Sequence, residues 1–229
     1  CLSVRGIARD LTAKGVGTLK PLNIKKTTSE EFESPISWSI QNDGNSCSFV
    51  VSRYYKDIKN SVSPEWLQKK LLSIGLRPIN ALVDITNFIT MDLGRPLHVF
   101  DADKIGNQLN MRLSNDQEKL LALDNKEYLL NDTTTVIADN KNPLAIAGII
   151  GGNDSGCTLE TKNVFLEVAV FNPSMVAKTG RKLGINSDAR YRFERGLDLE
   201  MVNEGLDYAT SLIQDICGGS FSKKTHAGD

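Results

Sequence analysis

Histidine and cysteine are scarce in this chain of 229 residues. The two histidines, His98 and His226, are too few for a His-rich metal centre, and no H-E-x-x-H motif is present. The four cysteines are scattered without a C-x-x-C pair, which argues against a zinc site or a disulfide framework and suits a reducing compartment. We therefore expect no bound metal in this chain and a cytoplasmic location.

Other signatures are missing as well. The net charge is -1, so any RNA contact must be a local patch and no DNA partner is expected. No apolar run approaches the length of a membrane span, so no membrane partner is expected. The phosphate-binding motifs G-x-G-x-x-G and G-K-[ST] and the nucleophile elbow G-x-S-x-G are absent, which disfavours nucleotide binding and covalent catalysis. The first residue is Cys rather than Met, so we expect a fragment of a longer chain.

Hydrophobic periodicity predicts helices at both ends of the chain and strands in the middle. The expected helices cover 2–15, 63–74 with Ser63 as N-cap, 80–93, 172–184 and 198–218, with one helical turn at 101–105. The expected strands cover 36–40, 47–51, 110–113, 119–123, 127–130, 134–138, 144–150 and 164–171. The turn signal at 42–45 predicts a hairpin between the first two strands. This order indicates an α+β fold rather than a doubly wound sheet.

The run from Arg77 to Asp101 organises the chain. Its helix carries the polar residues Asp84, Thr86 and Asn87, which core packing does not require. After the predicted stop at Gly94, an extended segment leads to His98. Either these side chains cap and bridge the backbone, with His98 a core histidine, or they line a site.

Glu167 interrupts the apolar strand 164–171. It either alternates outward to solvent, pairs with an arginine, or lies in a buried site, where an unpaired carboxylate is costly. Gly148, Gly151 and Gly152 form either an ordinary turn or a place where the backbone closely approaches a ligand. The densest basic stretch is either a salt-bridged face or a phosphate contact. It comprises Lys178, Arg181, Lys182, Arg190, Arg192 and Arg195.

Three long runs resemble one family. They read RPINALVDITNFITMDLGRPLHVFD (77–101), LAIAGIIGGNDS (144–155) and SDARYRFERGLD (187–198). Together they are similar, in sequence and order, to the B3/B4 domain of the β subunit of bacterial phenylalanyl-tRNA synthetase. The resemblance implies a mixed, sandwich-like β core with helices packed around it. We expect the chain to divide into an N-terminal helix and connecting segment (1–45), the B3/B4 domain (46–220) and a tail (221–229) that is either frayed or leads to a following domain.

The resemblance implies an editing activity within an aminoacyl-tRNA synthetase, a ligase of protein biosynthesis. The substrate would be tyrosine mischarged onto the 3′ end of tRNA(Phe). Aminoacylation would reside in a separate α subunit of an α2β2 enzyme, which uses ATP and Mg²⁺; no cofactor is expected in this chain.

Carried over position by position, the family's editing site falls on ten residues. The expected catalytic residues are His98, Arg77 and Thr86. The expected substrate-binding residues are Glu167, Asn87, Pro96, Gly151, Gly152, Ser187 and Ala189. Ser187 stands where relatives often have Thr. In this scheme Glu167 accepts the phenolic O–H, Thr86 and Asn87 hold the polar end of the amino acid, and His98 with Arg77 orients water and the terminal ribose.

Binding physics explains why such an activity is needed. An apolar pocket built for phenylalanine rejects an added hydroxyl by only about 10², whereas a site that binds the hydroxyl discriminates by about 10⁴ or more. Two other functions remain open. One is a non-catalytic tRNA-docking module whose editing site has degraded, and the other is a stand-alone amino-acid-binding domain.

Overall fold

The structure is a computed structural model that describes residues 2–25, 32–41 and 46–228. The helices are α1 (Val4–Ala13), α2 (Glu65–Ser73), α3 (Ala81–Leu93), α4 (Pro173–Leu183), α5 (Asp188–Phe193) and α6 (Met201–Cys217), with a 3₁₀ turn η1 (Ala102–Lys104). The strands are β1 (Ser37–Ile40), β2 (Cys47–Lys56), β3 (His98–Asp101), β4 (Gln108–Leu113), β5 (Lys119–Leu121), β6 (Glu127–Leu129), β7 (Thr135–Ala138), β8 (Pro143–Ile146), β9 (Ile150–Gly151), β10 (Val164–Phe171), β11 (Ser220–Phe221) and β12 (Thr225–Gly228).

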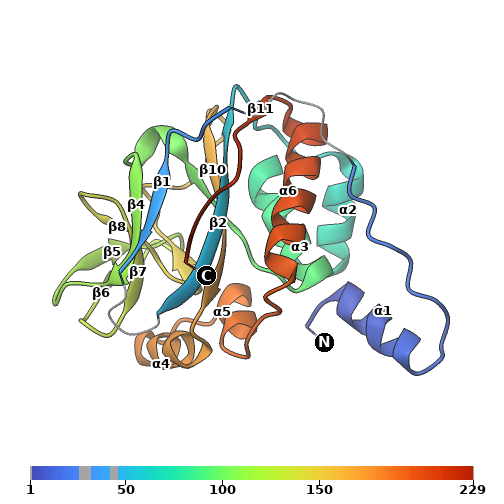
Figure 1. The fold of residues 1–229 in the computed structure, drawn as a ribbon, viewed down its shortest axis with the longest axis horizontal. Helices are drawn as coiled ribbons and strands as arrows, with labels where there is room; N and C mark the ends of the chain where they lie inside the picture. The colour runs from blue at the N-terminus through green and yellow to red at the C-terminus, as the bar shows by residue number, and fades with distance from the viewer. Residues whose placement is uncertain (1, 26–31, 42–45, 229) are drawn as a thin grey trace.

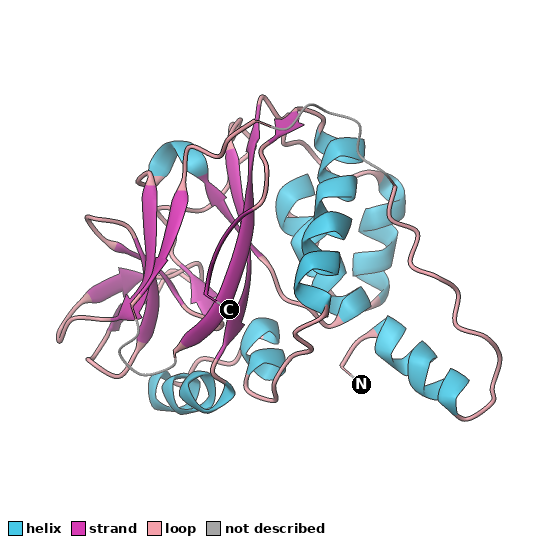
Figure 2. Ribbon diagram, in the orientation of Figure 1, coloured by secondary structure: helices cyan, strands magenta, loops and turns pink. Residues whose placement is uncertain are grey.

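The elements form three layers. The middle layer is the sheet β11-β2-β10-β3, to which β12 adds through β2. One face of this sheet packs on the second sheet, β1-β4-β7-β8-β9, and the other face packs on α2, α3 and α6 (Figure 1). Helices α4 and α5 lie together below the sheets in the view of Figure 2. The predicted α+β class with a sandwich-like β core is confirmed.

Strand β10 is buried on both faces because it lies in the middle layer. Phe165 and Ala169 belong to the core between the two sheets, while Leu166 and Val168 belong to the core under the helices. This burial explains the nearly continuous apolar sequence of the strand. Since side chains alternate along a strand, Glu167 shares the face of Phe165 and Ala169 and points between the sheets. The alternative in which it alternates outward to solvent is therefore wrong.

Helix α3 begins and ends where its sequence predicts. The Asn80 side chain accepts a hydrogen bond from Val83 N at 3.1 Å, and Gly94 ends the helix in the left-handed region at φ 75°. The same pair of signals bounds α4, where Asn172 caps the first turn and Gly184 follows the last. These caps fix the points at which the chain enters and leaves both helices.

Asp84 has a structural role. Its buried carboxylate accepts hydrogen bonds from Ser63 Oγ at 2.5 Å and from Ile79 N at 2.9 Å. The predicted N-cap role of Ser63 is wrong, because its hydroxyl bonds to Asp84 and Pro64 takes the N-cap position without a side-chain bond. Asp84 thus ties the segment before α2 to the loop before α3.

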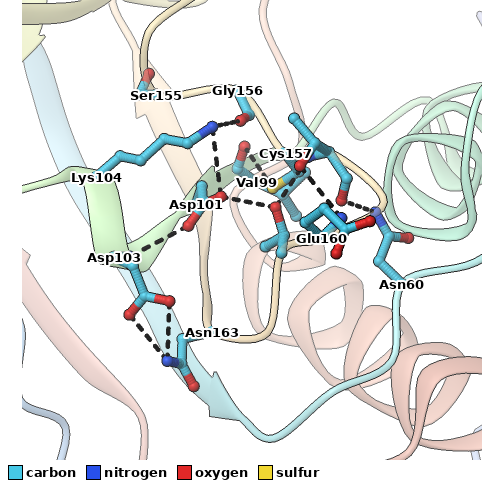
Figure 3. A network of polar contacts seen from close by, with 12 residues as sticks. Asn60, Val99, Asp101, Asp103, Lys104, Ser155, Gly156, Cys157, Glu160 and Asn163 are labelled. Carbon is cyan, nitrogen blue, oxygen red and sulfur yellow. Dashed lines mark hydrogen bonds and ion pairs between the residues drawn. The ribbon is translucent and has the colours of Figure 1, made fainter.

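A second polar network holds the far end of β3, the strand that begins at His98 (Figure 3). Asp101 accepts a hydrogen bond from Thr161 Oγ1 at 2.7 Å, and its backbone N donates to Ser155 O at 2.9 Å. Lys104 Nζ lies 3.5 Å from the same carboxylate and donates to Gly156 O. The loop between β9 and β10 is therefore fastened to β3.

Other expectations need correction. The predicted hairpin is wrong, because β1 pairs in parallel with β4 while β2 pairs with β10, β11 and β12; the turn at 42–45 lies outside the described residues. The predicted strand 144–150 is broken into β8 and β9 by a turn in which Gly148 has φ 68°. The tail is not frayed up to residue 228, since β11 and β12 pair with β2.

Helix α5 was not predicted, because a helix of six residues is too short to show a hydrophobic period. The proposed domain boundaries stay a prediction.

We predict that Asp84→Ala lowers the free energy of unfolding by about 1–3 kcal/mol, because it leaves the buried Ser63 hydroxyl and the Ile79 N–H without their acceptor. Urea denaturation measures the loss. Asp10→Ala, an exposed carboxylate on α1, is the control and should change stability by less than about 0.5 kcal/mol. Equal stability of both variants would contradict the structural role of Asp84.

Candidate active site

Glu167 and His98 are direct neighbours across the β10–β3 ladder. The antiparallel register pairs Glu167 with His98 on one side and with Ser52 of β2 on the other. Directly opposed residues point to the same face, so both side chains enter the space between the two sheets. Strand pairing thus brings together Glu167 and His98, two of the residues that were predicted to form the site.

A cavity of about 390 Å³ opens at this position. Its volume lies within the range of roughly 300–1,000 Å³ typical of small-molecule sites. The wall combines residues from β3, β10, the β8–β9 turn and the start of α5, and most of it is apolar. A few polar side chains in an apolar pocket are the usual composition of a selective binding site.

His98 is half-buried, and its neighbours pack closely around the ring. Its ring meets Phe100 edge to face with centroids 4.4 Å apart. A Cβ atom added at Gly151 would lie 2.9 Å from Nε2 of His98 and closer still to Cε1, so only glycine fits there. Nε2 is buried without a hydrogen-bond partner among the described residues. Such an unpaired buried nitrogen is uncommon in folded proteins.

Burial also sets the charge of the histidine. Desolvation lowers the pKa of His98 from 6.5 to about 4, so the imidazole is neutral at pH 7. A neutral ring offers one nitrogen as acceptor and the other as donor. It orients water well, but a group of pKa about 4 is a weak general base at neutral pH.

Glu167 is 4% exposed, and its carboxyl makes no hydrogen bond with any described residue. Burial raises its pKa from 4.5 to about 8, while the positive charge of Arg95 acts in the opposite direction. The group is therefore mainly protonated at pH 7. A neutral carboxylic acid both donates and accepts, which is the capacity needed to pair with a phenolic hydroxyl.

Arg95 is a residue that sequence reasoning missed. It is the largest fully buried side chain among the described residues, and it donates from Nη1 to Ala169 O at 2.9 Å and from Nη2 to Asp198 O. Gly205 of α6 leaves room for it. The guanidinium therefore links β10, two residues beyond Glu167, to the segment that precedes α6. The Gly94-Arg95-Pro96 sequence gave no sign that the arginine is buried.

Five further predicted residues line the cavity. They are Asn87, Pro96, Gly151, Ser187 and Ala189. The Ser187 hydroxyl donates to Ile149 O at 2.6 Å and accepts from Arg190 N at 3.1 Å, so it caps α5 and places Ala189 at the wall. The structure gives their positions, whereas their roles toward a substrate stay predictions.

Three predicted residues do not line the cavity. Thr86 donates its hydroxyl to Val83 O at 2.8 Å within α3. Gly152 lies on the other side of the β8–β9 hairpin, where its N–H donates to Leu144 O at 2.7 Å. Arg77 is exposed in the loop between α2 and α3. These three residues lie outside the cavity lining, and their roles toward a substrate stay predictions.

The apolar wall was also missed. Leu123, 49% exposed after β5, covers the cavity beside Gly151, and Phe171 and Phe193 meet edge to face at 4.9 Å deeper in it. These residues come from separate segments of the chain, so no local pattern could have joined them.

Neither a metal centre nor a reactive thiol emerges from the described residues. Within 2–25, 32–41 and 46–228, no three His, Cys, Asp or Glu side chains are grouped to hold a metal ion. Burial raises the pKa of the Cys47 thiol to about 12, and the nearby carboxyl of Glu167 acts in the same direction. A thiol with so high a pKa is inert as a nucleophile. No helix in the described ranges is long and apolar enough to cross a membrane.

We predict a distinctive pH dependence of stability from Glu167. Its pKa is higher in the folded state (about 8) than the ordinary 4.5, so the folded protein holds a proton that the unfolded chain releases. This contribution is complete below pH 4.5 and is lost as pH rises to 8, with a slope of about 1.4 kcal/mol per pH unit.

The isosteric Glu167→Gln variant keeps the neutral shape and removes the titration. The difference in unfolding free energy between wild type and this variant, measured by urea denaturation from pH 5 to 8, should fall as pH rises. A difference independent of pH would show that the carboxyl is not desolvated.

Comparisons with known proteins identify the family of this chain. A family model described as the B3/4 domain matches residues 46–218. The β subunit of phenylalanine–tRNA ligase from Brucella suis is 51% identical over 221 residues, which cover 96% of this chain and 27% of the relative. The subunit from Paramagnetospirillum magneticum is 51% identical over 231 residues, which cover 100% of this chain and 29% of the relative. The chain thus spans less than a third of the length of these relatives.

A solved structure shares the fold. The N-terminal fragment of the phenylalanyl-tRNA synthetase β subunit from Pyrococcus horikoshii has a TM-score of 0.58 at 17% identity, covering 99% of this chain and 62% of that fragment. At this identity the likeness concerns the fold alone. Since the family model covers most of the chain and the curated relatives are half identical to it, this chain belongs to the B3/4 domain family of phenylalanine–tRNA ligase β subunits.

Proposed function

We propose that this chain is an editing domain that hydrolyses the ester of tyrosine mischarged onto tRNA(Phe). The observation that carries the proposal is Glu167, a buried carboxyl without a hydrogen-bond partner among the described residues, beside His98 in a cavity of about 390 Å³. An apolar pocket with one such acid is suited to an aromatic ring that carries a hydroxyl.

In this proposal the tyrosine ring lies against the apolar wall and its hydroxyl pairs with Glu167. The carboxyl is mainly protonated at pH 7, so it exchanges both a donor and an acceptor bond with the phenol. Phenylalanine would leave the buried carboxyl unpaired, which penalises its binding. Pro96 and Ala189 form part of the wall, and Asn87 faces the polar end of the amino acid.

The reaction adds water to the ester carbonyl. The water oxygen forms a new bond to the carbonyl carbon, the bond to the ribose oxygen breaks, and that oxygen takes up a proton, giving tyrosine and free tRNA. Because His98 is neutral and weakly basic, we assign it to positioning the water rather than to removing its proton. Ester hydrolysis needs no covalent intermediate, consistent with the inert Cys47 beside the cavity.

The parent enzyme is proposed from the relatives. They are β subunits of phenylalanine–tRNA ligase, so we infer an α subunit partner and tRNA(Phe) as the shared substrate. ATP and Mg²⁺ would serve aminoacylation on the α subunit, and no editing step assigned here uses them.

We predict that Glu167→Ala removes the preference for tyrosine. The full-length enzyme would be given preformed Tyr-tRNA(Phe) and Phe-tRNA(Phe), and the two hydrolysis rates compared. Wild type should prefer the tyrosyl ester by about 10⁴, and the variant should lose most of this preference. Undiminished discrimination in the variant would contradict the role of Glu167, and absence of hydrolysis in wild type would favour a non-catalytic docking module.

His98 should contribute less than a general base does. Removing a general base typically slows a reaction by about 10²–10⁴. We therefore expect His98→Asn, which retains hydrogen-bonding atoms, to slow hydrolysis of Tyr-tRNA(Phe) by less than about 10² and to keep the tyrosine preference. A larger loss with a rate that follows ionisation near pH 6–7 would make His98 the base.

A further inference from the structure

The basic stretch at residues 178–195 divides into two groups with different surroundings. Each of the three arginines on and after α5 forms an ion pair within the fold, and two of them share one carboxylate. Arg190 pairs with Glu194 at 3.0 Å, Arg192 with Asp188 at 3.0 Å, and Arg195 with Glu194 at 2.8 Å. Arg192 is also buried and donates to Leu2 O. This group serves the structure.

The other group lies on α4. Lys178, Arg181 and Lys182 are exposed, and none has an ion pair or side-chain hydrogen bond with any residue in the described ranges. Helix α4 contains no acidic residue. The spacing of three and four positions places the three cations on one face, with neighbouring Cβ atoms about 5–6 Å apart. A chain of net charge -1 therefore presents a local positive face here.

Helix α4 is mounted rigidly next to the cavity. A Cβ atom at Gly180 would lie 2.9 Å from Cζ of Arg190 and closer still to its Cδ, so the glycine lets α5 pack tightly on α4. Phe171, just before α4, and Ser187, just after it, both line the cavity. Lys182 and Ser187 are close in sequence, which limits the distance between their Cα atoms to about 18 Å.

We propose that Lys178, Arg181 and Lys182 bind backbone phosphates of the single-stranded RNA whose 3′-terminal ester enters the cavity. The inference rests on the proposed function, since an ester on a terminal ribose brings the preceding phosphates to the cavity mouth. Charge complementarity supports this occupant: unpaired cations on a helix without acidic residues attract phosphates, and arginine can hold a phosphate with two parallel hydrogen bonds.

The test compares two variants of equal charge in the full-length enzyme. One is the triple change Lys178→Gln, Arg181→Gln and Lys182→Gln, in which glutamine preserves helix propensity. The matched control changes Lys14, Lys59 and Lys162 to Gln; these are exposed lysines without a side-chain partner among the described residues. Lys59 and Lys162 lie beyond the ends of β2 and β10 that are farther from α4.

Each enzyme receives two substrates. One is Tyr-tRNA(Phe), and the other is the tyrosine ester of adenosine, which has no phosphate. The α4 variant should raise KM for Tyr-tRNA(Phe) about tenfold with kcat nearly unchanged. Its hydrolysis of the adenosine ester should equal that of wild type, and the control should match wild type on both substrates.

Salt dependence gives a second readout that needs no hydrolysis. A labelled short RNA ending in CCA is titrated with each enzyme at several salt concentrations. The slope of log Kd against log salt should be smaller in the α4 variant, by about 0.7 for each phosphate that its side chains no longer neutralise.

Four outcomes would overturn the inference: an unchanged KM and salt slope, an equal loss in the control, an equal loss on the adenosine ester, or binding to acidic vesicles in place of RNA. Failure of wild type to hydrolyse either ester would instead contradict the proposed function, while the RNA titration would still test the α4 face.

Discussion

Burial of the Glu167 carboxyl between two sheets, beside the neutral ring of His98, depends on the pairing of β10 with β3. Water solvates a carboxyl far better than an apolar core does, so the surrounding fold must supply the free energy that keeps this group buried. It does so by burying the apolar side chains of β10 on both faces. Because burial raises the pKa of Glu167 and lowers the pKa of His98, both side chains are mainly neutral at pH 7. The cavity therefore contains two polar groups without a full charge on either of them.

Contacts with neighbouring segments hold the strands that carry Glu167 and His98 in place. Arg95 bonds to the backbone beyond Glu167, and the Asp101 network fastens β3 after His98. The backbone of Gly151 lies so close to the His98 ring that a side chain at position 151 would clash with it. These contacts involve buried groups that hold one another in place, so the geometry is formed before any ligand arrives. Preorganised groups discriminate well because little ordering is required on binding.

Much of this arrangement could be predicted from the sequence, and the remainder has identifiable physical reasons. Helix start and stop signals such as Asn172 and Gly94 act locally, and the helix ends that they mark were predicted correctly. Strand partners depend on contacts distant in sequence, so the β1–β2 hairpin was predicted wrongly and β12 was missed. Gly148 divides an apolar run into two strands because its left-handed backbone turns the chain, which an apolar pattern cannot signal.

Some residues of the candidate site could likewise be predicted from the sequence, and others could not. Family resemblance located Glu167, His98 and the glycine beside the ring, while strand register explains why they meet. Side-chain direction within a helix escaped prediction, so Thr86 and Asp84 were grouped with Asn87 although both bond to their own surroundings. The arginine that sequence reasoning missed, Arg95, is buried by α6, which lies about a hundred residues away in the chain.

The most direct test of a role for Glu167 in tyrosine recognition is a crystal structure of this protein with a non-hydrolysable amide analogue of 3′-tyrosyl adenosine. We predict that the tyrosine ring lies in the cavity, with its phenolic oxygen about 2.6–3.0 Å from a carboxyl oxygen of Glu167. A ring bound outside the cavity, or a phenolic oxygen more than about 4 Å from Glu167, would contradict the claim.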